Sequence, residues 1–272
     1  MTDLKQKSGL PLQLDEAMEL AFPHELMVKD RSARTLESMI PYLEPLKSTG
    51  DLPIYRVFRD VLLAKDREIL SPTGLKYDIT IIAPGVFQLQ DNREEFFRTA
   101  GHYHKRDSAG AKLPEVYEVI SGEAQWLIQR YTDDPANIEE IYLIEGTPGD
   151  KVCIPPGFGH ITINVAPGVL VISNIIAKSC EYDYAPFQYL KGGGFRLLAS
   201  TYPDMVEIER NGNYQSVPSL SKLKPRKDWY NGYFETLYSV LASNPERFKF
   251  LTEPETYNPD FFSIKKLYQE IT

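Results

Sequence analysis

The chain has 272 residues, of which 42% are hydrophobic and 25% are charged, and its formal net charge is −8. This composition is typical of a globular protein that is large enough to bury a core. The acidic balance, together with the lack of a run rich in Lys and Arg, argues against a nucleic-acid-binding protein.

The sequence also argues against a membrane or disulfide-rich secreted protein. No apolar run reaches about 18 residues, the length at which a transmembrane helix is considered, and the first residues lack the apolar segment of a signal peptide. The two cysteines, Cys153 and Cys180, do not resemble a secreted scaffold, and Cys153 lies in an apolar segment where we expect a buried thiol. We therefore expect a cytoplasmic protein.

The first fifty residues are expected to form a helical appendage. Apolar residues at helical spacing predict one helix over residues 15–26 and another over residues 31–46, which Pro41 interrupts. His24 stands beside Pro23 in this region, and we expect it to be a surface or capping residue rather than a metal ligand. Such an appendage covers a barrel end or a dimer interface more often than it carries out chemistry.

From Pro53 the pattern changes to the alternation of period two that is typical of strands. Turn residues such as Ser71-Pro-Thr-Gly74 and Asn211-Gly-Asn213 separate the segments. Many short strands divided by turns indicate a sandwich or a barrel. The predicted strands cover residues 54–61, 76–82, 96–103, 115–120, 124–131, 141–144, 151–154, 160–165 and 170–176, with two more within 196–209.

After Pro225 the pattern becomes helical again, with predicted helices at residues 233–241 and 261–271. We therefore expect three parts in the chain. A helical appendage covers residues 1–50, a β-barrel covers residues 51–215, and a helical C-terminal extension at residues 216–272 packs on the barrel.

Three of the four histidines lie in one stretch of the sequence, between Gly101 and Asn164. His102 and His104 are two residues apart, and an extended backbone sends positions two apart to the same face. Glu115 begins the next predicted strand, and His160 begins a later one. Three imidazoles and a carboxylate suit a mid-series divalent ion such as iron, manganese, nickel, cobalt or zinc.

This stretch resembles the two-part signature of the cupin superfamily. The second part runs from Gly149 through Pro155-Pro156-Gly157 and His160 to Asn164, and it matches at every fixed position. The first part has Phe96 where the signature has a glycine, and a longer gap before Glu115. Within the superfamily the chain resembles the cupin-type glucose-6-phosphate isomerases most closely, over roughly residues 50–215. The residues that carry this likeness are Tyr77-Asp-Ile-Thr80, Thr99-Ala-Gly-His-Tyr-His104, Glu115-Val-Tyr117, Gly122, Pro155-Pro156 and His160-Ile-Thr-Ile-Asn164.

The resemblance implies a mainly β fold, the cupin double-stranded β-helix barrel, here with helical additions at both ends. It implies one divalent metal ion per subunit, held by His102, His104, Glu115 and His160. Iron(II) is our first expectation, ahead of manganese, nickel, cobalt or zinc. The implied activity is the interconversion of glucose 6-phosphate and fructose 6-phosphate, a step of glycolysis and gluconeogenesis, and by analogy we expect a homodimer.

The resemblance also assigns roles to individual residues. It suggests Glu115 as the catalytic base with Tyr117 beside it, while a metal-assisted hydride shift is the rival mechanism. Thr80, Thr99 and Gly101 align with phosphate-contacting positions, and Tyr55 and Arg98 are weaker candidates. The family often carries a further histidine near an Asp-Tyr pair, whereas this chain has Glu181 and Tyr182 before Asp183-Tyr184, so either of those two side chains is expected to take its place.

Fold alone does not decide function, and the same residues leave three alternatives open. The first is another sugar-phosphate isomerase or epimerase, and the second is a metal-dependent cupin dioxygenase. The third is a sugar-binding cupin without catalytic activity. Thr80, Thr99 and the Glu115-Val-Tyr117 motif favour the isomerase.

Overall fold

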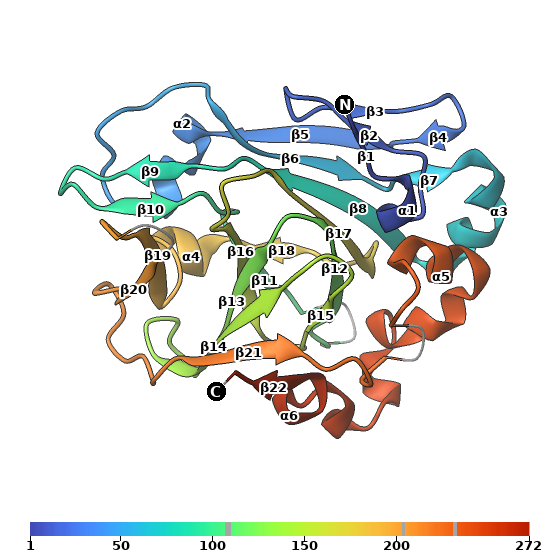
Figure 1. Cartoon of the computed structure of the whole chain (residues 1–272). Coiled ribbons are helices and arrows are strands. Elements are labelled where there is room, and N and C mark those ends of the chain that lie inside the picture. The colour runs from blue at the N-terminus through green and yellow to red at the C-terminus, as the bar shows by residue number, and fades with distance from the viewer. Residues whose placement is uncertain (107–109, 203–204, 231–232, 272) are drawn as a thin grey trace.

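Two β-sheets face each other and form the body of the protein (Figure 1). A computed structural model describes residues 1–106, 110–202, 205–230 and 233–271. Among these residues the larger sheet has the strand order β15-β12-β17-β8-β6-β5, and the opposing sheet has the order β16-β13-β14-β21-β22. The strands of the larger sheet are β5 (Asp30–Thr35), β6 (Pro53–Arg59), β8 (Leu75–Ile82), β12 (Glu115–Ser121), β15 (Lys151–Ile154) and β17 (Leu170–Ala177). Those of the opposing sheet are β13 (Ala124–Tyr131), β14 (Ile138–Gly146), β16 (Gly159–Asn164), β21 (Ser221–Pro225) and β22 (Tyr268–Glu270).

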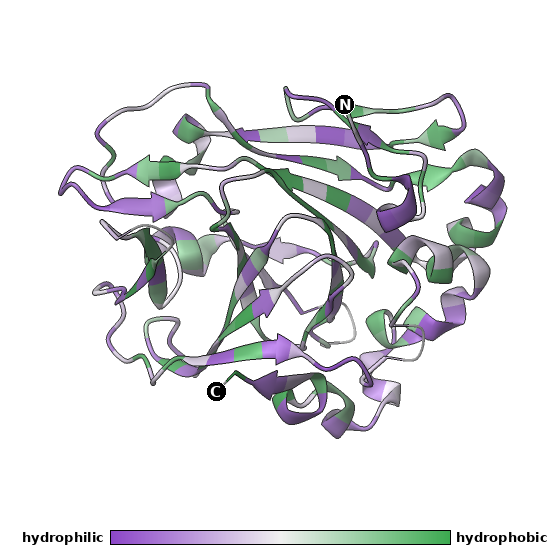
Figure 2. Cartoon of the chain, viewed as in Figure 1, coloured by the Kyte–Doolittle hydropathy of each residue, from purple (hydrophilic) through white to green (hydrophobic). Residues whose placement is uncertain are grey.

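The depth of each strand in the sheet explains its hydropathy. Every residue of β17 is buried, because the opposing sheet covers its inner face and the helical segments of the C-terminal extension contact it from outside. Strand β5 forms the sheet edge and its first four residues are exposed. Figure 2 shows the same contrast, with β5 mostly hydrophilic and β6 and β8 rich in hydrophobic residues. Burial of β-branched and aromatic side chains between the sheets supplies the main stabilisation of this body.

Smaller sheets accompany the two main ones. One has the order β20-β19-β10-β9, another pairs β11 with β18, a third pairs β4 with β7, and the N-terminal strands pair as β1-β2-β3. Their bounds are β1 (Thr2–Asp3), β2 (Gln13–Leu14), β3 (Leu20–Ala21), β4 (Leu26–Met27), β7 (Leu62–Leu63), β9 (Val86–Gln88), β10 (Glu94–Phe96), β11 (Tyr103–His104), β18 (Tyr182–Asp183), β19 (Phe195–Ala199) and β20 (Val206–Arg210).

The helices are short. The α-helices are α1 (Lys5–Ser8), α2 (Leu36–Met39), α3 (Arg67–Leu70), α4 (Ala185–Tyr189), α5 (Leu237–Ser243) and α6 (Ile264–Leu267). The 3-10 helices are η1 (Ile40–Tyr42), η2 (Ala64–Asp66), η3 (Ser71–Thr73), η4 (Pro245–Leu251), η5 (Pro254–Thr256) and η6 (Pro259–Phe262). Among the described residues, no helix is long and apolar enough to cross a lipid bilayer.

The predicted mainly β fold, with two sheets that face each other, is confirmed, and most predicted strands lie where expected. The exception is the segment 96–103, where β10 ends at Phe96 and β11 begins only at Tyr103. Between them the chain runs beside β16 through isolated bridges, one of which joins His102 to His160. Gly101 has a φ of +75°, a left-handed value that interrupts a regular strand and that glycine adopts without strain.

The helix predicted at residues 15–26 is wrong. This segment contains β3 and β4 with turns beside them, because a few apolar residues at helical spacing also satisfy short strand pairing, and Pro23 disfavours a helix. The helix predicted at residues 31–46 is also largely wrong. Residues 30–35 form β5, and α2 begins only after Thr35, whose side chain and that of Ser38 form a capping box.

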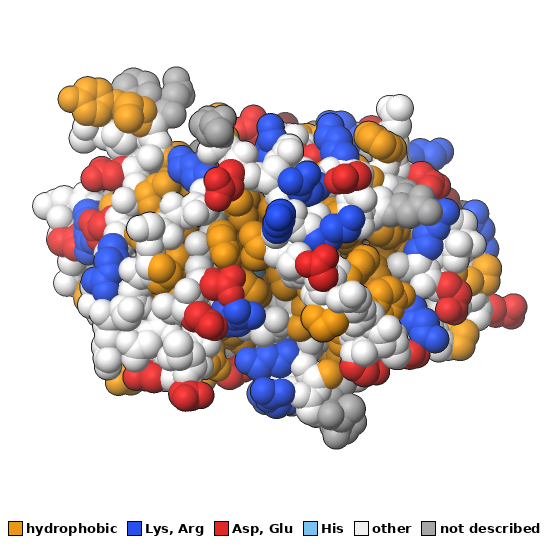
Figure 3. Space-filling view, turned by 90° about the horizontal axis from the view of Figure 1, so that it is seen from below, with side chains coloured by type: hydrophobic (Ala, Val, Ile, Leu, Met, Phe, Trp, Pro, Cys, Tyr) orange, Lys and Arg blue, Asp and Glu red, His pale blue; other side chains and the backbone are white. Residues whose placement is uncertain are grey.

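The C-terminal segment adds both strands and helices to the body. β21 pairs in parallel with β14, and β22 pairs with β21, so the segment extends the opposing sheet. The helix predicted at 233–241 corresponds only in part to α5, and the one predicted at 261–271 is interrupted, because α6 ends at Leu267 and β22 follows. Figure 3 views the molecule from below and shows Lys and Arg side chains interspersed with acidic and hydrophobic ones.

Candidate metal centre

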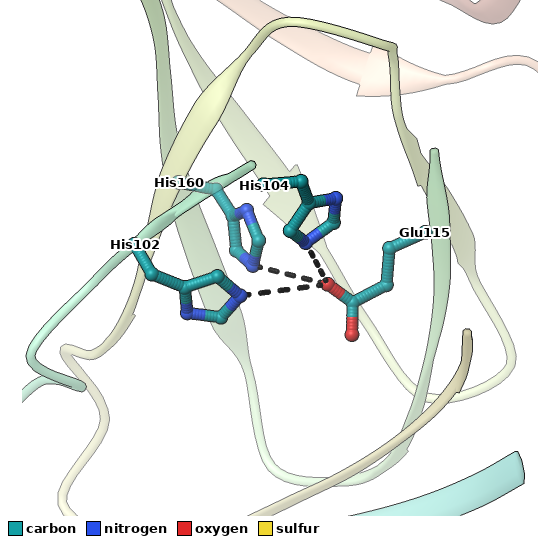
Figure 4. Close-up of side chains that lie close together, drawn as sticks. All are labelled: His102, His104, Glu115 and His160. Atoms are coloured by element: carbon teal, nitrogen blue, oxygen red, sulfur yellow. Dashed lines mark ion pairs between the residues drawn. The ribbon is translucent and has the colours of Figure 1, made fainter. Parts of the chain in front are cut away.

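Four side chains from separate elements meet inside the barrel (Figure 4). His104 lies on β11, Glu115 is the first residue of β12, and His160 lies on β16. His102 is held next to His160 by two backbone hydrogen bonds of 3.2 and 3.0 Å. The extended backbone from His102 to His104 turns both imidazoles to the same side, as the sequence spacing predicts.

One oxygen of Glu115 is the point on which the imidazoles converge. Its Oε2 lies 3.3 Å from Nε2 of His104, 3.3 Å from Nε2 of His160 and 3.9 Å from Nε2 of His102. One potential ligand atom from each of the four residues lies within 4.8 Å of the other three. The side chains of His104, Glu115 and His160 are each only 2% exposed, so this cluster of polar atoms is shielded from bulk water.

The neighbouring hydrogen bonds orient the cluster in the way that a metal site requires. Nδ1 of His104 lies 2.6 Å from the carbonyl oxygen of Leu113, so Nδ1 carries the proton and Nε2 presents its lone pair to the centre. Asn174 donates a 2.6 Å hydrogen bond to Oε1 of Glu115 and leaves Oε2 free. Nε2 of His102 and of His104 and Oε2 of Glu115 are buried without a hydrogen-bond partner. Buried polar atoms of this kind are rare unless an ion or water satisfies them, so these residues fit a divalent cation.

The electrostatics of the cluster favour the same conclusion. Burial opposes the charge on Glu115, but the imidazoles of His104 and His160 hold the pKa of Glu115 well below its usual range. Burial and the neighbouring imidazoles lower the pKa of His102 far below 6.5. For His104, burial is outweighed by Cys180 and Glu115, which raise its pKa to about 10. A cation that binds to the four side chains displaces the second proton of this imidazole and takes the lone pair of Nε2.

A cavity opens beside this cluster. On the larger sheet, side chains directly opposite each other in the register point to the same face. The cavity is lined there by Ser32, Arg34, Tyr55, Val57, Arg59, Asp78, Thr80, Glu115, Tyr117, Ile172 and Asn174. The remaining wall is formed by Thr99, Gly101, His102, His160, Thr162, Tyr182 and Tyr184. Most of these side chains are polar, which suits a hydroxylated ligand.

The three residues predicted to contact phosphate all line this cavity. Oγ1 of Thr99 accepts a 3.0 Å hydrogen bond from the backbone N–H of Thr162, which leaves the hydroxyl proton of Thr99 for another acceptor. At Gly101 a Cβ atom would collide with the side chain of Ile161, so glycine is needed there on steric grounds as well. Thr80 lies on β8, in line with Val57 and Ser32 across the sheet.

Of the two weaker candidates for phosphate contact, only one lines the cavity. Tyr55 lines the cavity, whereas Arg98 is buried elsewhere and forms an ion pair with Glu95 and a hydrogen bond to the carbonyl of Tyr42. Tyr117 also faces the cavity, and its hydroxyl lies 2.8 Å from Nε2 of His160. Burial and the Glu115 carboxylate raise the pKa of Tyr117 well above its usual value, so Tyr117 stays a neutral phenol that can donate a hydrogen bond.

Tyr182 and Glu181, the two residues expected to replace the family's further histidine, also lie in different surroundings. Tyr182 lines the cavity, and its ring centroid lies 4.3 Å from that of His102. Its hydroxyl accepts a 3.1 Å hydrogen bond from Nζ of Lys76. Glu181 is exposed and pairs with Lys105 outside the cavity. Of the two residues, only Tyr182 is therefore placed to meet a ligand.

Sequence reasoning missed the contribution of β5 and its neighbour β6. Arg34, Ser32 and Arg59 line the cavity, but residues 31–46 were assigned to a helix, and Arg59 was not singled out. Had residues 30–35 been recognised as a strand, the alternation of Ser32 and Arg34 would have placed both side chains on one face.

Comparison with known proteins shows the family. The sequence pattern described as "Glucose-6-phosphate isomerase (GPI)" matches residues 31–214, about two thirds of the chain. The chain belongs to the glucose-6-phosphate isomerase family. Membership of this family identifies it as an isomerase by class, and the matched region holds the four clustered side chains and the whole lining of the cavity.

Individual relatives are similar over the same region. The glucose-6-phosphate isomerase of Thermococcus litoralis is 27% identical over 160 residues, which cover 57% of this chain and 73% of that protein. The glucose-6-phosphate isomerase of Pyrococcus abyssi is 32% identical over 144 residues, which cover 53% of this chain and 62% of that protein. A solved structure of oxalate decarboxylase from Bacillus subtilis aligns with a TM-score of 0.31 and 18% identity over 50% of this chain and 28% of that chain. This last likeness is too distant to bear on function.

Proposed function

We propose that this protein interconverts glucose 6-phosphate and fructose 6-phosphate with one divalent cation held by His102, His104, Glu115 and His160. The observation that carries the proposal is the convergence of these buried side chains beside a polar cavity, in a chain of the glucose-6-phosphate isomerase family. When bound, such a cation acts as a Lewis acid that polarises the sugar carbonyl and stabilises negative charge on oxygen.

The proposal assigns the proton transfer to Glu115. An aldose–ketose isomerase moves hydrogen between C1 and C2, and a carboxylate at the cavity wall is a suitable base for that transfer. Asn174 holds Oε1 of Glu115, and Tyr117 lies two residues further along the same face of β12. A carboxylate that also binds a cation is a weaker base. A hydride shift is therefore the alternative mechanism, and turnover in D2O distinguishes the two. Solvent deuterium on the product sugar supports Glu115 as the base. Product sugar without deuterium supports the hydride shift.

In this proposal the substrate phosphate lies against Thr80, Thr99 and Gly101. The two threonines offer hydroxyl donors, and Gly101 allows the phosphate to approach the backbone closely. All three line the cavity that also contains His102 and Glu115. A sugar phosphate that spans these groups would place its reactive carbons near the cluster and its phosphate at the other side.

The identity of the cation and the assembly are part of the same proposal. Three imidazoles and one carboxylate leave coordination positions open, a donor set that suits iron(II) and also manganese, nickel, cobalt or zinc. We expect iron(II) first. By analogy with cupins we also expect a homodimer that acts in the cytoplasm, in glycolysis or gluconeogenesis.

A coupled assay tests the proposal directly. Protein treated with a chelator is supplied with iron(II), manganese, nickel, cobalt or zinc one at a time, and conversion of fructose 6-phosphate to glucose 6-phosphate is followed. Activity that disappears with the chelator and returns with one or more of these ions is the expected result. Folded, metal-loaded protein without activity towards fructose 6-phosphate would contradict the proposal and direct attention to other phosphosugars or to a binding role.

A further inference from the structure

Arg34 places a guanidinium group in the wall of the cavity. The residue lies on β5 directly opposite Tyr55 on β6, and both line the cavity. The carbon at the centre of the guanidinium lies 5.9 Å from the ring centroid of Tyr42 and 5.7 Å from that of Tyr184. Two aromatic rings therefore hold the flat group in place through cation–π contact.

This guanidinium differs from the other charged groups of the cavity because no carboxylate neutralises it. Arg59 forms a 3.0 Å ion pair with Asp30 and a hydrogen bond to Ser32, and Asp78 pairs with Lys76 at 3.1 Å. For Arg34, no Asp or Glu of the described residues lies within ion-pair distance. A half-buried guanidinium that packs on neutral tyrosines and has no carboxylate partner, at a ligand cavity, points to an anion that arrives with the ligand.

The contacts of Arg34 show where it lies relative to the metal ligand His102 and to Thr80. The ring of Tyr184 contacts both groups, because its centroid lies 5.7 Å from the central carbon of the Arg34 guanidinium and 5.6 Å from the centroid of the His102 imidazole. On the sheet, Arg34 shares its face with Ser32, which continues across β6 to Thr80. Arg34 is therefore at the side of the cavity where Thr80 lies and is linked to the metal ligand His102 through the Tyr184 ring.

We infer that Arg34 binds the phosphate group of the substrate and supplies the positive charge that Thr80, Thr99 and Gly101 lack. This inference rests on the proposed function. Those three residues offer only neutral donors, and the chain as a whole carries a net charge of −8, so a phosphate needs a local cation. A guanidinium presents a fork of N–H donors that matches two phosphate oxygens at once, and the tyrosine rings on Arg34 keep that fork oriented.

The test compares two variants of Arg34 with a matched control on the same strand. Arg34→Met removes the charge, and Arg34→Lys keeps the charge but removes the fork. Arg31→Met is the control, because Arg31 is exposed and packs over Phe22 and Phe58 instead of lining the cavity. Metal content and the urea midpoint of each variant check that the fold is intact.

Binding is measured by calorimetry with sorbitol 6-phosphate, which has the phosphate but no carbonyl to isomerise, on the metal-loaded protein. We expect Arg34→Met to raise the Kd at least tenfold, as expected for loss of a charge-assisted contact, Arg34→Lys to raise it less, and Arg31→Met to match the wild type. Inorganic phosphate should compete with the ligand in the wild type and much less in Arg34→Met. In the coupled assay the KM for fructose 6-phosphate should rise more than kcat falls.

The two readouts separate this inference from the proposed function. Wild-type protein that does not turn over fructose 6-phosphate, but binds sorbitol 6-phosphate in a manner that depends on Arg34, would support the inference and contradict the proposed reaction. A folded Arg34→Met variant that binds sorbitol 6-phosphate within twofold of the wild type would overturn the inference, even where the isomerase assay succeeds. Wild-type protein that fails to bind sorbitol 6-phosphate would overturn it as well.

Discussion

The side-chain amide of Asn174 donates a 2.6 Å hydrogen bond to Oε1 of Glu115. The two residues lie on neighbouring strands, β17 and β12, and both are buried. Because this hydrogen bond fixes Oε1, the carboxylate is oriented so that Oε2 faces the imidazoles of His104 and His160. Sequence reasoning did not single out Asn174, although it supports the central ligand of the site.

Replacing Asn174 by Ala should weaken metal binding without unfolding the barrel. Loss of a hydrogen bond that orients a metal ligand typically costs about 10- to 100-fold in metal affinity, and we expect a loss in that range. Competition with a chelator measures it. Ser173→Ala is the control, since its side chain points to the opposite face of β17; equal affinities in the two variants would show that Glu115 needs no support from Asn174.

Thr99→Val should raise the KM for fructose 6-phosphate by about tenfold, the effect of losing one hydrogen bond to a charged group. The hydroxyl of Thr99 accepts from the Thr162 backbone and has its own proton free to donate. Thr99→Ser keeps that donor and should stay close to the wild type. Steady-state kinetics at saturating metal provides the comparison, and a KM that is equal in all three proteins would remove Thr99 from the phosphate site.

The strands and the metal cluster were predictable because local pattern decides them. The segments at β6, β8, β12 and β13 alternate over seven or eight residues between turns, and the spacing of His102 and His104 places both on one face of an extended chain. The pairing of β16 with the segment before β11 then brings His160 beside His102. Once the strands are known, little freedom remains for the four side chains.

The edge of the sheet and the C-terminal segment were not predictable in this way. Leu36, Ile40 and Leu43 have helical spacing, but residues 30–35 gain more from pairing with β6 than from a helix, and a tertiary contact of this kind is invisible in local periodicity. This misassignment concealed Arg34. Likewise β21 pairs in parallel with β14, which lies far away in the sequence. A parallel pair of this kind leaves no short-range pattern from which it could be predicted.

Glu118 and Lys151 form a buried ion pair that ties the C-terminal extension to the barrel. Their charged atoms lie 3.0 Å apart, both side chains are 2% exposed, and Glu118 accepts a 2.8 Å hydrogen bond from the backbone N–H of Leu237 at the start of α5. Removing Lys151 leaves the buried carboxylate of Glu118 unpaired, so Lys151→Met should lower the free energy of unfolding by about 3–5 kcal/mol. Urea denaturation measures this, and the double variant Glu118→Gln/Lys151→Met should recover part of the loss.

The pH dependence of stability provides an independent check on Glu118. Burial raises its pKa above the usual 4.5, although Lys151 and the Leu237 N–H oppose the shift. The folded state therefore binds this proton more readily than the unfolded state does. As a result, the contribution of Glu118 to stability grows as the pH falls through the folded pKa toward 4.5, and it is lost as the pH rises. Glu118→Gln lacks the titration, and its stability profile should be flatter than that of the wild type in that window; parallel profiles would contradict the assignment.

Cys153 should be unreactive in the folded protein although it is a free thiol. Its side chain is fully buried in β15, and burial raises its pKa far above the usual value, so the reactive thiolate is suppressed. The hydroxyl of Tyr268 on β22 donates to the Cys153 carbonyl and keeps the C-terminal strand next to it. Titration with a thiol reagent at pH 8 should label one group per native chain, the partly exposed Cys180, and two in urea. Cys180→Ser should therefore give no rapid labelling, and rapid reaction of that variant would mean that β22 opens away from β15 in solution.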